Sequence, residues 1–485
     1  MMNKDTGINF LIVGIGALIV GMFYGCFGAL QHVYPELNEY FSFQKTRPLH
    51  VSLVIAWLYL GAIGGIYYYL PNKCGVPLYS QLLAKLHLWI FTITGFVIIA
   101  LYSMGIFGGR EYWAFPPILA IPIVVSWGMF GYNYIKTIFA VKTPWPVYFW
   151  MWGTGILFFL FTFLESYLWM IPYFGDSIVR DMTVQWKSYG AIVGTWNMLI
   201  YGTAIFLMEK VSEDSGMPDL EEAAPKMGHS KIAFLLFFLG FLNLLFGWAH
   251  HLYLLPSAGW IRHMGYLISM TELLIIARLI WQFRANFIAG TNRFHIMPFR
   301  FLMAADIWIF VNLALALLIS VPAIQLYTHG THVTVAHAMG STIGINTMIL
   351  LASLFFVVGD RKKVPNNGIV AKGFWIANIS FFVFFVCLVA AGIVKGFGVI
   401  EEEQTYHEVQ ASISPFILVF AYSGLVMFVG FCLVLIPAAK TLMSASVTGV
   451  TGELSSSAAV EHEAIEIPPS GSADHLSGGK PDSAQ

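Results

Sequence analysis

The chain has 485 residues, of which 58% are hydrophobic and 11% are charged, and its formal net charge at pH 7 is −1. A water-soluble domain of this size would expose too much apolar surface, so the composition excludes that class and indicates a polytopic membrane protein. The balanced charge gives no sign of a nucleic-acid partner.

Twelve apolar segments are long enough to cross a bilayer, and we expect all of them to be helices, because a lone strand would leave its backbone unpaired in lipid. They cover residues 8–30, 48–70, 83–106, 115–138, 147–171, 186–208, 231–254, 259–282, 300–321, 332–358, 370–396 and 412–438. The first is too long for a signal-peptide core, so we expect it to be retained as a membrane helix.

The sequence therefore predicts an all-α polytopic membrane domain over residues 1–440. It is followed by a tail over 441–485, rich in Ser, Gly, Pro and acidic residues, which we expect to be disordered. Placing both termini in the cytoplasm gives that side 18 of the 25 Lys and Arg residues. By the positive-inside rule, both termini are then cytoplasmic in a plasma or inner membrane.

The four cysteines are scattered, and no CxxC or CxxCH pattern occurs. We therefore expect neither a disulfide framework nor a covalently attached c-type heme within this chain.

Histidines from three distant spans come to one depth, in the outer half of the membrane. His50 lies in the first turn of 48–70, His250 and His251 lie near the end of 231–254, and His337 lies two turns into 332–358, followed by Met339. Each alone could be a packing residue, and Met is a common gap-filler. Intramembrane ionisable groups are costly and usually functional, and His and Met are heme ligands. We therefore expect a heme or metal site.

Spacing adds detail to this expectation. Each helical residue turns by about 100°, so His337 and Met339 point about 200° apart and could each ligate a heme on opposite sides of one helix. His50 could then be the second axial ligand of the heme at Met339. His250 and His251 suit a single metal only near a helix end, and Pro256 predicts such an end.

These motifs and the twelve-span layout resemble subunit I of the heme–copper oxidase superfamily, in particular its nitric oxide reductase branch, over about residues 10–440. The resemblance implies a low-spin heme held by His50 and Met339 and a high-spin heme held by His337. It also implies a non-heme iron, or copper, at His250 and His251.

Two further residues gain roles from the resemblance. His329, eight residues before His337, takes the position that contacts a heme propionate in many members. Glu272 takes the position of a glutamate near the active site and a proton route. The alternative for Glu272 is a hydrogen bond at a helix interface.

The sequence departs from the family at two places. The family's second histidine on its tenth helix is Met339 here. The sixth helix of the reductases carries a histidine with glutamates four and eight residues later, and the GTWN at 194–197 places Tyr189, Val193 and Asn197 at these positions. Two histidines alone rarely hold a non-heme iron.

Two residues of this chain are candidates to replace the missing histidine and glutamates. Glu165, in the outer half of its span, could replace the lost carboxylate, or it could be a hydrogen-bonded glutamate near the interface. Tyr189 could indicate dioxygen chemistry, since the oxidases couple a tyrosine to their active site.

The resemblance implies an oxidoreductase that reduces nitric oxide, a gas, to nitrous oxide. Its electrons would come from a separate membrane-anchored c-type cytochrome subunit. A dioxygen-reducing terminal oxidase, a nitric oxide dismutase and a catalytically silent heme protein for electron transfer or gas sensing are the alternatives. A twelve-helix transporter would explain the spans but not the ligands gathered at one depth.

Overall fold

The computed structural model describes residues 5–213, 227–271, 273–274, 296–361 and 367–463. Within these ranges the chain is all-α, and the single β-type contact is an isolated bridge between Arg110 and Trp113. The chain divides into two compact units, Met1–Leu442 and Met443–Gln485. The predicted all-α class is confirmed.

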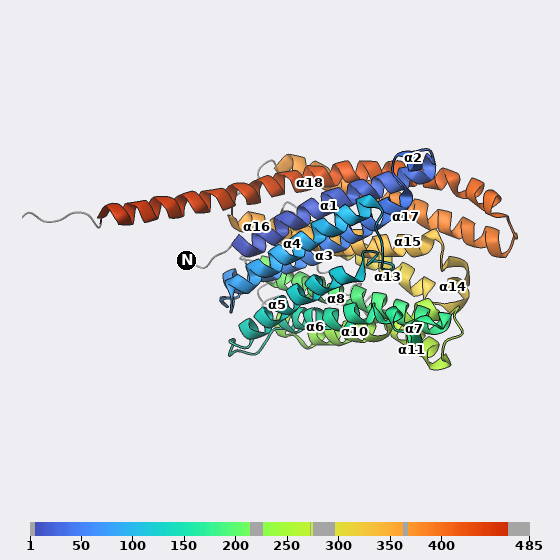
Figure 1. The fold of residues 1–485 in the computed structure, drawn as a ribbon, viewed down its shortest axis with the longest axis horizontal. Coiled ribbons are helices and arrows are strands. Elements are labelled where there is room, and N and C mark those ends of the chain that lie inside the picture. Colours follow the sequence, from blue (N-terminus) through green and yellow to red (C-terminus); the bar gives the residue numbers. More distant parts are fainter. Residues whose placement is uncertain (1–4, 214–226, 272, 275–295, 362–366, 464–485) are drawn as a thin grey trace, which may run out of the picture. The chain divides into compact units, whose positions relative to one another are not determined.

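The first unit is a bundle of long helices joined by short ones (Figure 1). The long helices are α1 (Asp5–Val33), α3 (Phe43–Asn72), α4 (Gln81–Met104), α5 (Ala120–Ile138), α6 (Val147–Glu165), α8 (Ile178–Glu213), α10 (Lys231–Phe246), α13 (Met297–Ile319), α16 (Met348–Arg361), α17 (Asn367–Ile400) and the part of α18 (Tyr406–Glu463) up to Leu442. The short helices are α2 (Leu37–Tyr40), α7 (Pro172–Gly175), α11 (Gly259–Met270), α14 (Pro322–Thr328) and α15 (His332–Met339).

Several segments depart from regular α-helix. Short 3₁₀ turns cover Pro117–Leu119, Leu168–Met170, Met227–His229 and Gly247–Leu252. A π-helical segment, Gly340–Thr347, joins α15 to α16. π-Helical turns inside α-helices are rare and frequently mark functional sites, and this one directly follows Met339.

Eleven helices within the described ranges are long and apolar enough to cross a bilayer. They correspond to eleven of the twelve predicted spans. The remaining prediction, 259–282, begins as α11 and then continues into residues outside the described ranges. The fold is that of a polytopic membrane protein.

The last membrane helix is longer than the sequence suggests. α18 continues to Glu463, past residue 440, where we placed the end of the membrane domain. The boundary between the two compact units falls after Leu442. Disorder of the 441–485 tail stays a prediction, with the qualification that the segment up to Glu463 is helical.

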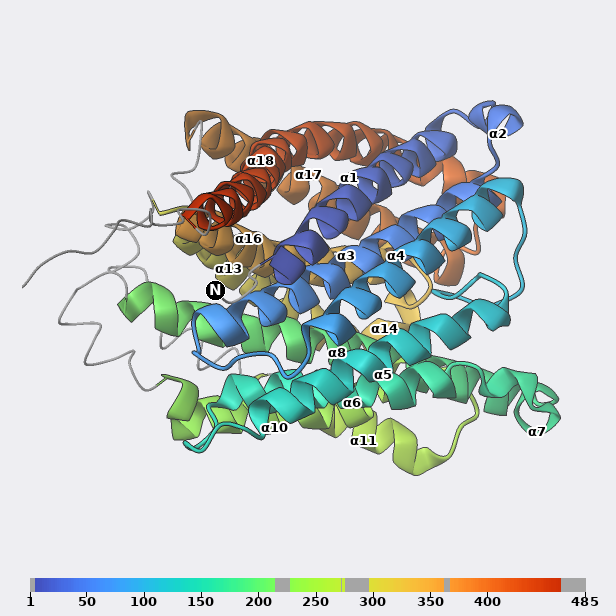
Figure 2. The ribbon, with the colours of Figure 1, turned by 60° about the vertical axis from the view of Figure 1, so that its left-hand side comes forward.

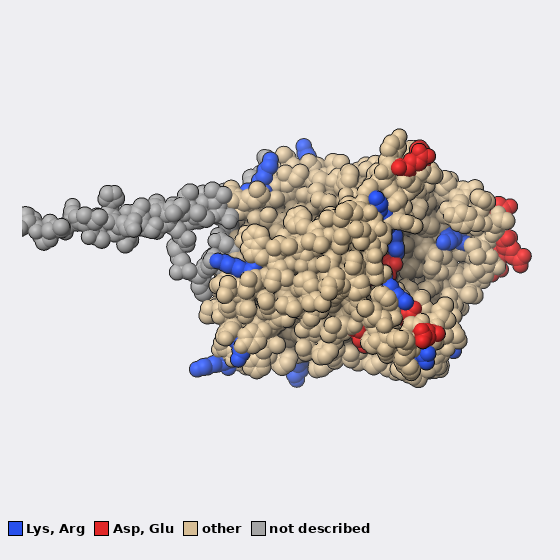
Figure 3. All heavy atoms as spheres, in the orientation of Figure 1, with Lys and Arg blue, Asp and Glu red and all other residues tan. Residues whose placement is uncertain are grey.

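The outward surface of the bundle is apolar where lipid would contact it. On α4 large exposed apolar side chains recur every three or four residues, among them Leu82, Leu86, Trp89, Ile93, Phe96 and Val97. Figure 3 shows the middle of one face free of charged side chains, with Lys and Arg alone at one end and the acidic groups toward the other. A wide apolar belt with charges confined to its ends is what a bilayer-embedded surface requires.

Close helix contacts depend on small residues. α1 and α3 lie side by side along their length (Figure 2), and the backbones touch at Gly7 and Gly64. A Cβ added at Gly7 would lie 2.7 Å from the Gly64 carbonyl oxygen. Small residues allow membrane helices to approach this closely, which replaces the missing hydrophobic drive between helices in lipid. The close approach matters for the site, because the backbone of α1 bonds to His50 of α3.

The π-helical segment and α16 form one helix, which bonds to its neighbours through polar side chains at seven-residue intervals. This spacing keeps the polar side chains on one face of the helix. The pairs are Asn346 with Asn197 of α8 (3.0 Å), Ser353 with Tyr69 of α3 (2.6 Å) and Asp360 with Lys73 just after α3 (2.7 Å). Hydrogen bonds between membrane helices are individually modest in free energy, so the main effect of these pairs is to fix how the helices are aligned along their length.

We expect Tyr69→Phe to destabilise the bundle by about 1 kcal/mol, because it removes the hydroxyl that bonds Ser353 between two buried helices. Tyr40→Phe is the control, since the Tyr40 side chain is 84% exposed. Thermal unfolding in detergent should show a lower midpoint for the first variant only. Equal midpoints for both variants would show that this hydrogen bond contributes nothing to stability.

Candidate functional site

A cavity of about 1360 Å³ runs between α1, α3, α8, α10, α13, α15, the π-helical segment and α18. This volume exceeds the roughly 300–1,000 Å³ of a usual single-ligand pocket. Six of the predicted site residues line it, namely His50, Tyr189, His250, His251, His337 and Met339. These residues of distant spans therefore share one cavity, and their roles as ligands stay a prediction.

His50 lies two turns into α3, against the backbone of α1. Its Nδ1 is 2.8 Å from the Gly21 carbonyl oxygen, which fixes the ring and holds the proton on Nδ1. Gly25 makes this approach possible, since a Cβ there would lie 2.7 Å from two ring atoms of His50. A backbone carbonyl on one imidazole nitrogen is the usual arrangement behind a metal-ligating histidine, and it leaves Nε2 for the metal.

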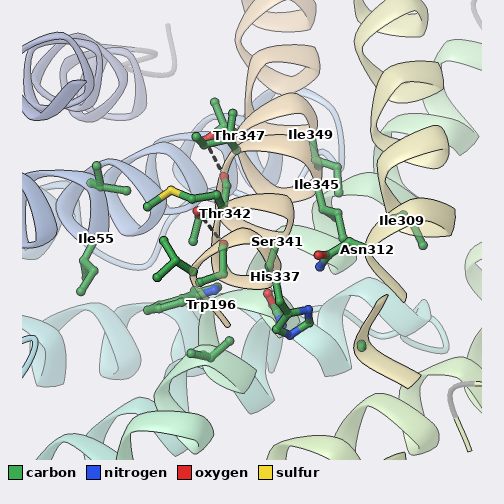
Figure 4. A pocket seen from close by; sticks show the side chains of 18 of the residues that line it. Ile55, Trp196, Ile309, Asn312, His337, Ser341, Thr342, Ile345, Thr347 and Ile349 are labelled. Atoms are coloured by element: carbon green, nitrogen blue, oxygen red, sulfur yellow. Dashed lines mark hydrogen bonds between the residues drawn. The ribbon is translucent and has the colours of Figure 1, made fainter. Parts of the chain in front are cut away.

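His337 is fixed by an asparagine of the neighbouring helix α13. The Asn312 side-chain nitrogen donates to the His337 carbonyl oxygen (3.0 Å) and lies 3.3 Å from its Nδ1, while the Asn312 oxygen accepts from the Ser341 N–H (3.2 Å). An unbroken α-helix would pair that carbonyl and that N–H with each other, so Asn312 bridges the helix where its geometry changes. Figure 4 shows His337 and Asn312 next to each other at the pocket. Gly340 leaves room for Asn312, whose side-chain amide would lie 2.2 Å from an added Cβ.

Met339 ends α15 and is half-buried against the main hydrophobic core. It lines the same cavity as His50 and His337. The structure thus places the predicted ligand residues of both hemes along one continuous space. Axial ligation by Met339 stays a prediction.

The two adjacent histidines lie on a 3₁₀ turn. α10 ends at Phe246 and Gly247–Leu252 continues as 3₁₀ helix, in agreement with the predicted helix end. His250 Nδ1 is 3.0 Å from the Ser269 hydroxyl, and the His250 carbonyl accepts from the Gln325 amide (2.5 Å). The two imidazole rings are 4.2 Å apart between centroids. His250 therefore presents Nε2 as its free nitrogen.

His251 lies against aromatic neighbours. Its ring stacks on Trp186 of α8, with centroids 4.6 Å apart and planes 10° apart. Its Nδ1 is buried without a hydrogen-bond partner among the described residues. His329, between α14 and α15, comes within 5.9 Å of the His251 ring, and burial lowers the pKa of His329. His329 is therefore neutral at pH 7, with a lone pair available for a metal or a hydrogen-bond donor.

The three positions that lack the reductase ligands all line the cavity: Tyr189, Val193 and Asn197. The Tyr189 ring packs 4.9 Å from the Tyr112 ring, and a tyrosine hydroxyl with its ordinary pKa of about 10 is neutral at pH 7. The Asn197 oxygen accepts from Asn346. Neither polar side chain is an anionic metal ligand at pH 7.

Glu165 does not line the cavity. Its carboxylate pairs with Lys187 of α8 beside a small pocket that borders Leu244 of α10. Within the described ranges, no three His, Cys, Asp or Glu side chains converge as they stand on one metal position. The role of Glu165 as a replacement ligand stays a prediction. Glu272 lies outside the described residues.

Sequence reasoning missed the residues that hold the ligands in place. They are Asn312, Ser269, Gln325 and Trp186. The sequence carries one usable signal, since an asparagine inside the apolar run of α13 needs a buried partner. Ser269 and Gln325 lie near the ends of short helices, where polar residues are ordinary, and Trp186 is one of many aromatic residues in the apolar spans.

The family described as "Cytochrome C and Quinol oxidase polypeptide I" matches residues 5–437. The chain belongs to this family. Subunits I of this heme–copper oxidase family are heme-binding membrane oxidoreductases of respiratory electron transport.

Individual relatives of this family member are distant. A nitric oxide reductase subunit of Stutzerimonas stutzeri is 24% identical over 421 residues, covering 79% of this chain and 82% of that protein. The Cbb3-type cytochrome c oxidase subunit CcoN1 of the same organism is 21% identical over 416 residues, covering 80% and 83%. The cryo-EM structure of a heme-copper terminal oxidase dimer matches with a TM-score of 0.74 at 14% identity, covering 91% of this chain and 84% of that chain. That structural likeness establishes the fold.

The cavity residues fit the hemes that the family binds. His50 Nδ1 donates to the Gly21 carbonyl and so leaves Nε2 for a heme, and Gly25 clears the space for this contact. At His337 the Asn312 amide nitrogen donates to the backbone carbonyl and to Nδ1, and Gly340 clears the space for Asn312. The fit is weaker for the non-heme metal, since His250 and His251 supply two nitrogens and α8 carries Tyr189, Val193 and Asn197 in place of the reductase ligands.

We expect Gly25→Ala to reduce low-spin heme content several-fold, because the added methyl would overlap the His50 ring. Gly16→Ala, on the same helix, is the matched control, since a Cβ there meets nothing within 4 Å. Heme per protein and the reduced-minus-oxidised spectrum would be measured on both variants. Equal heme content in both would show that His50 does not hold a heme at this position.

Proposed function

We propose that this chain is the catalytic subunit of a membrane oxidoreductase that reduces nitric oxide to nitrous oxide. The observation that carries the proposal is the convergence of His50, His337 and the His250–His251 pair on one cavity. Similarity to a nitric oxide reductase over 79% of the chain favours this reaction over others of the family.

In the proposed reaction, two molecules of nitric oxide take up two electrons and two protons and give one nitrous oxide and one water. Bound hemes at His50 and His337 would supply electron transfer and a gas-binding iron. The chain's own contribution is placement. Asn312 sets the orientation of His337, and Ser269 orients His250.

Asn197 has a distinct role at the position of a family carboxylate. Its oxygen accepts from Asn346, which leaves its NH₂ group as a neutral donor at the cavity wall. A donor in a low-dielectric site stabilises negative charge that develops on a reacting gas. The same place in a carboxylate-bearing relative would instead attract a cation or a proton.

Electrons would come from a c-type cytochrome subunit. The sequence has no CxxCH motif for a covalent heme of its own, and similar proteins include cytochrome c oxidase subunits. The ligand histidines lie toward the end of the bundle that the topology prediction places outside. A donor that docks on that side would therefore have the shorter route to His50.

Reduction of dioxygen is the second candidate, favoured by Tyr189 at the cavity and by similarity to a Cbb3-type oxidase subunit over 80% of the chain. The purified complex, reduced and supplied with one gas at a time, distinguishes the two. We expect nitrous oxide from nitric oxide at a rate at least tenfold above the consumption of dioxygen. Rapid dioxygen consumption without nitrous oxide formation would contradict the proposal and support the oxidase.

Met339 provides a separate test of the low-spin site. We expect Met339→His to lower the midpoint potential of this heme by on the order of 0.1 V, because methionine ligation raises heme potentials. Met339→Leu, which keeps the size but removes the ligand, should convert the heme to a high-spin spectrum. Redox titration with optical detection measures both. Unchanged potential and spectrum in both variants would mean that Met339 only packs.

A further inference from the structure

An acidic side chain interrupts the apolar sequence of α13 well inside this membrane-spanning helix. Asp306 lies nine residues after the start of α13 at Met297 and thirteen residues before its end at Ile319, and it lines the large cavity. Ionisable side chains inside membrane spans are costly, and they usually mark the path of a proton, an ion or a substrate. Neither the ligand positions nor the supply of electrons uses Asp306, so its presence needs an explanation.

Asp306 has no partner within the described part of the chain. Among the described residues that line the cavity, those with an acidic or basic side chain other than histidine are Arg47, Glu111 and Asp306. Arg47 and Glu111 pair with each other, with Nη2 and Oε1 2.6 Å apart. Asp306 forms neither an ion pair nor a side-chain hydrogen bond with any described residue. Its carboxyl group is therefore left to the cavity.

Other carboxylates of the bundle are compensated by the protein. Asp360 of α16 bonds Lys73, with Oδ1 and Nζ 2.7 Å apart, and Glu209 of α8 accepts from the Gly228 backbone N–H at 2.8 Å. Asp306 lacks such compensation. A carboxylate without a partner is costly away from water, and binding of a proton removes that cost. A group in this position is suited to carry a proton and to release it only briefly.

The cavity connects Asp306 with the region of His337. Asn312, which bonds the His337 carbonyl, follows Asp306 by six residues on α13, a rise of about 9 Å along the helix axis. Figure 4 shows Asn312 and His337 next to each other at the pocket. A distance of about two turns is too long for one hydrogen bond, so proton transfer requires bridging water. Asn197, Asn312 and Ser341 line the same cavity and offer hydrogen-bond partners for such water.

The cavity also extends from Asp306 toward one end of the bundle. Met208, in the last two turns of α8, and Ser230, which caps the start of α10, both line it. The topology prediction places this end, where Lys231 begins α10, in the cytoplasm. Asp306 thus shares one continuous space with a helix end and with His337. A proton carrier needs access to both a source and a reaction site, and this cavity offers both.

We propose that Asp306 is a proton-transfer residue of this oxidoreductase. The inference rests on the proposed function and deepens it, since it names a source of the protons consumed. The carboxylic acid releases its proton toward the reacting gas near His337, and the resulting carboxylate takes up another through the part of the cavity that reaches Ser230. Formation of one nitrous oxide and one water consumes two protons, so Asp306 loses and regains a proton twice per turnover without net change.

The test is turnover of the purified complex with nitric oxide, measured as nitrous oxide formed. Asp306→Asn keeps the size of the side chain but cannot release a proton, and it should lower the rate at least tenfold. Asp306→Glu restores a carboxyl group and should recover most of the rate. Heme content and the reduced-minus-oxidised spectrum, measured on the same samples, should match wild type in both variants.

Infrared difference spectra between the oxidised and reduced complex give a readout that does not depend on turnover. The carbonyl stretch of a protonated carboxyl group is separate from the bands of a carboxylate. Wild type should show such a band that changes on reduction and shifts in heavy water. The band should be missing in Asp306→Asn and return at a shifted frequency in Asp306→Glu.

Glu209→Gln is the matched control. Glu209 is also a buried carboxylate of the bundle, but it accepts from the Gly228 N–H and the Tyr148 hydroxyl, and it is not among the residues that line the cavity. A role of buried carboxylates in packing alone would affect both positions. We expect the rate and the infrared band of this variant to equal those of wild type.

The outcomes separate the two proposals. A wild-type rate in Asp306→Asn, an equal loss in Glu209→Gln, or a carbonyl band that survives in Asp306→Asn overturns the role of Asp306 and leaves the proposed function standing. Failure of Asp306→Glu to recover the rate indicates a packing role and also overturns it. A wild-type complex that forms no nitrous oxide contradicts the proposed function itself, and the infrared band then decides whether Asp306 carries a proton.

Discussion

An imidazole buried in a membrane bundle must place both of its ring nitrogens, because neither can reach water. The protein resolves this for His50 with the Gly21 carbonyl and for His250 with the Ser269 hydroxyl. In each case one nitrogen is bonded to the protein and the other is left toward the cavity. An unpaired buried nitrogen costs free energy, so a histidine with one satisfied nitrogen is prepared for a metal on the other. The same contacts therefore determine which ring nitrogen of each histidine is available in the cavity.

The helix that carries His337 shows how the same constraint reaches into the fold. A π-helical turn after Met339 changes the direction of the following residues, and Asn312 bridges the carbonyl and N–H groups at the transition. Farther along the same helix, Ser353 and Asp360 bond to α3 and its end. The irregular turn is therefore held at its start by α13 and beyond it by α3. Rigid support on both sides lets a locally irregular backbone persist at a ligand site.

Much of the fold follows from the sequence because hydropathy and length determine membrane helices almost alone. Eleven predicted spans correspond to observed helices, and the histidines of three spans meet in one cavity. The pairing of Glu165 with Lys187 was not predictable, since 22 residues and two short helical turns separate them in the chain. The approach of His329 to His251 depends on how α14 meets the 3₁₀ turn of α10, which no local pattern encodes. The sequence identified candidate ligands, but only the packed structure shows which of them line the cavity and which bond elsewhere.

The residues that stand on α8 in place of the reductase ligands also change the charge of the site. Tyr189, Val193 and Asn197 contribute no negative charge where relatives with carboxylates would, and Glu165 neutralises Lys187 instead. An ion held by neutral imidazoles alone keeps its full charge in a medium of low dielectric constant, where an uncompensated divalent cation is costly. Because these residues carry no carboxylate, a metal bound here would keep more of its charge than one held beside a glutamate.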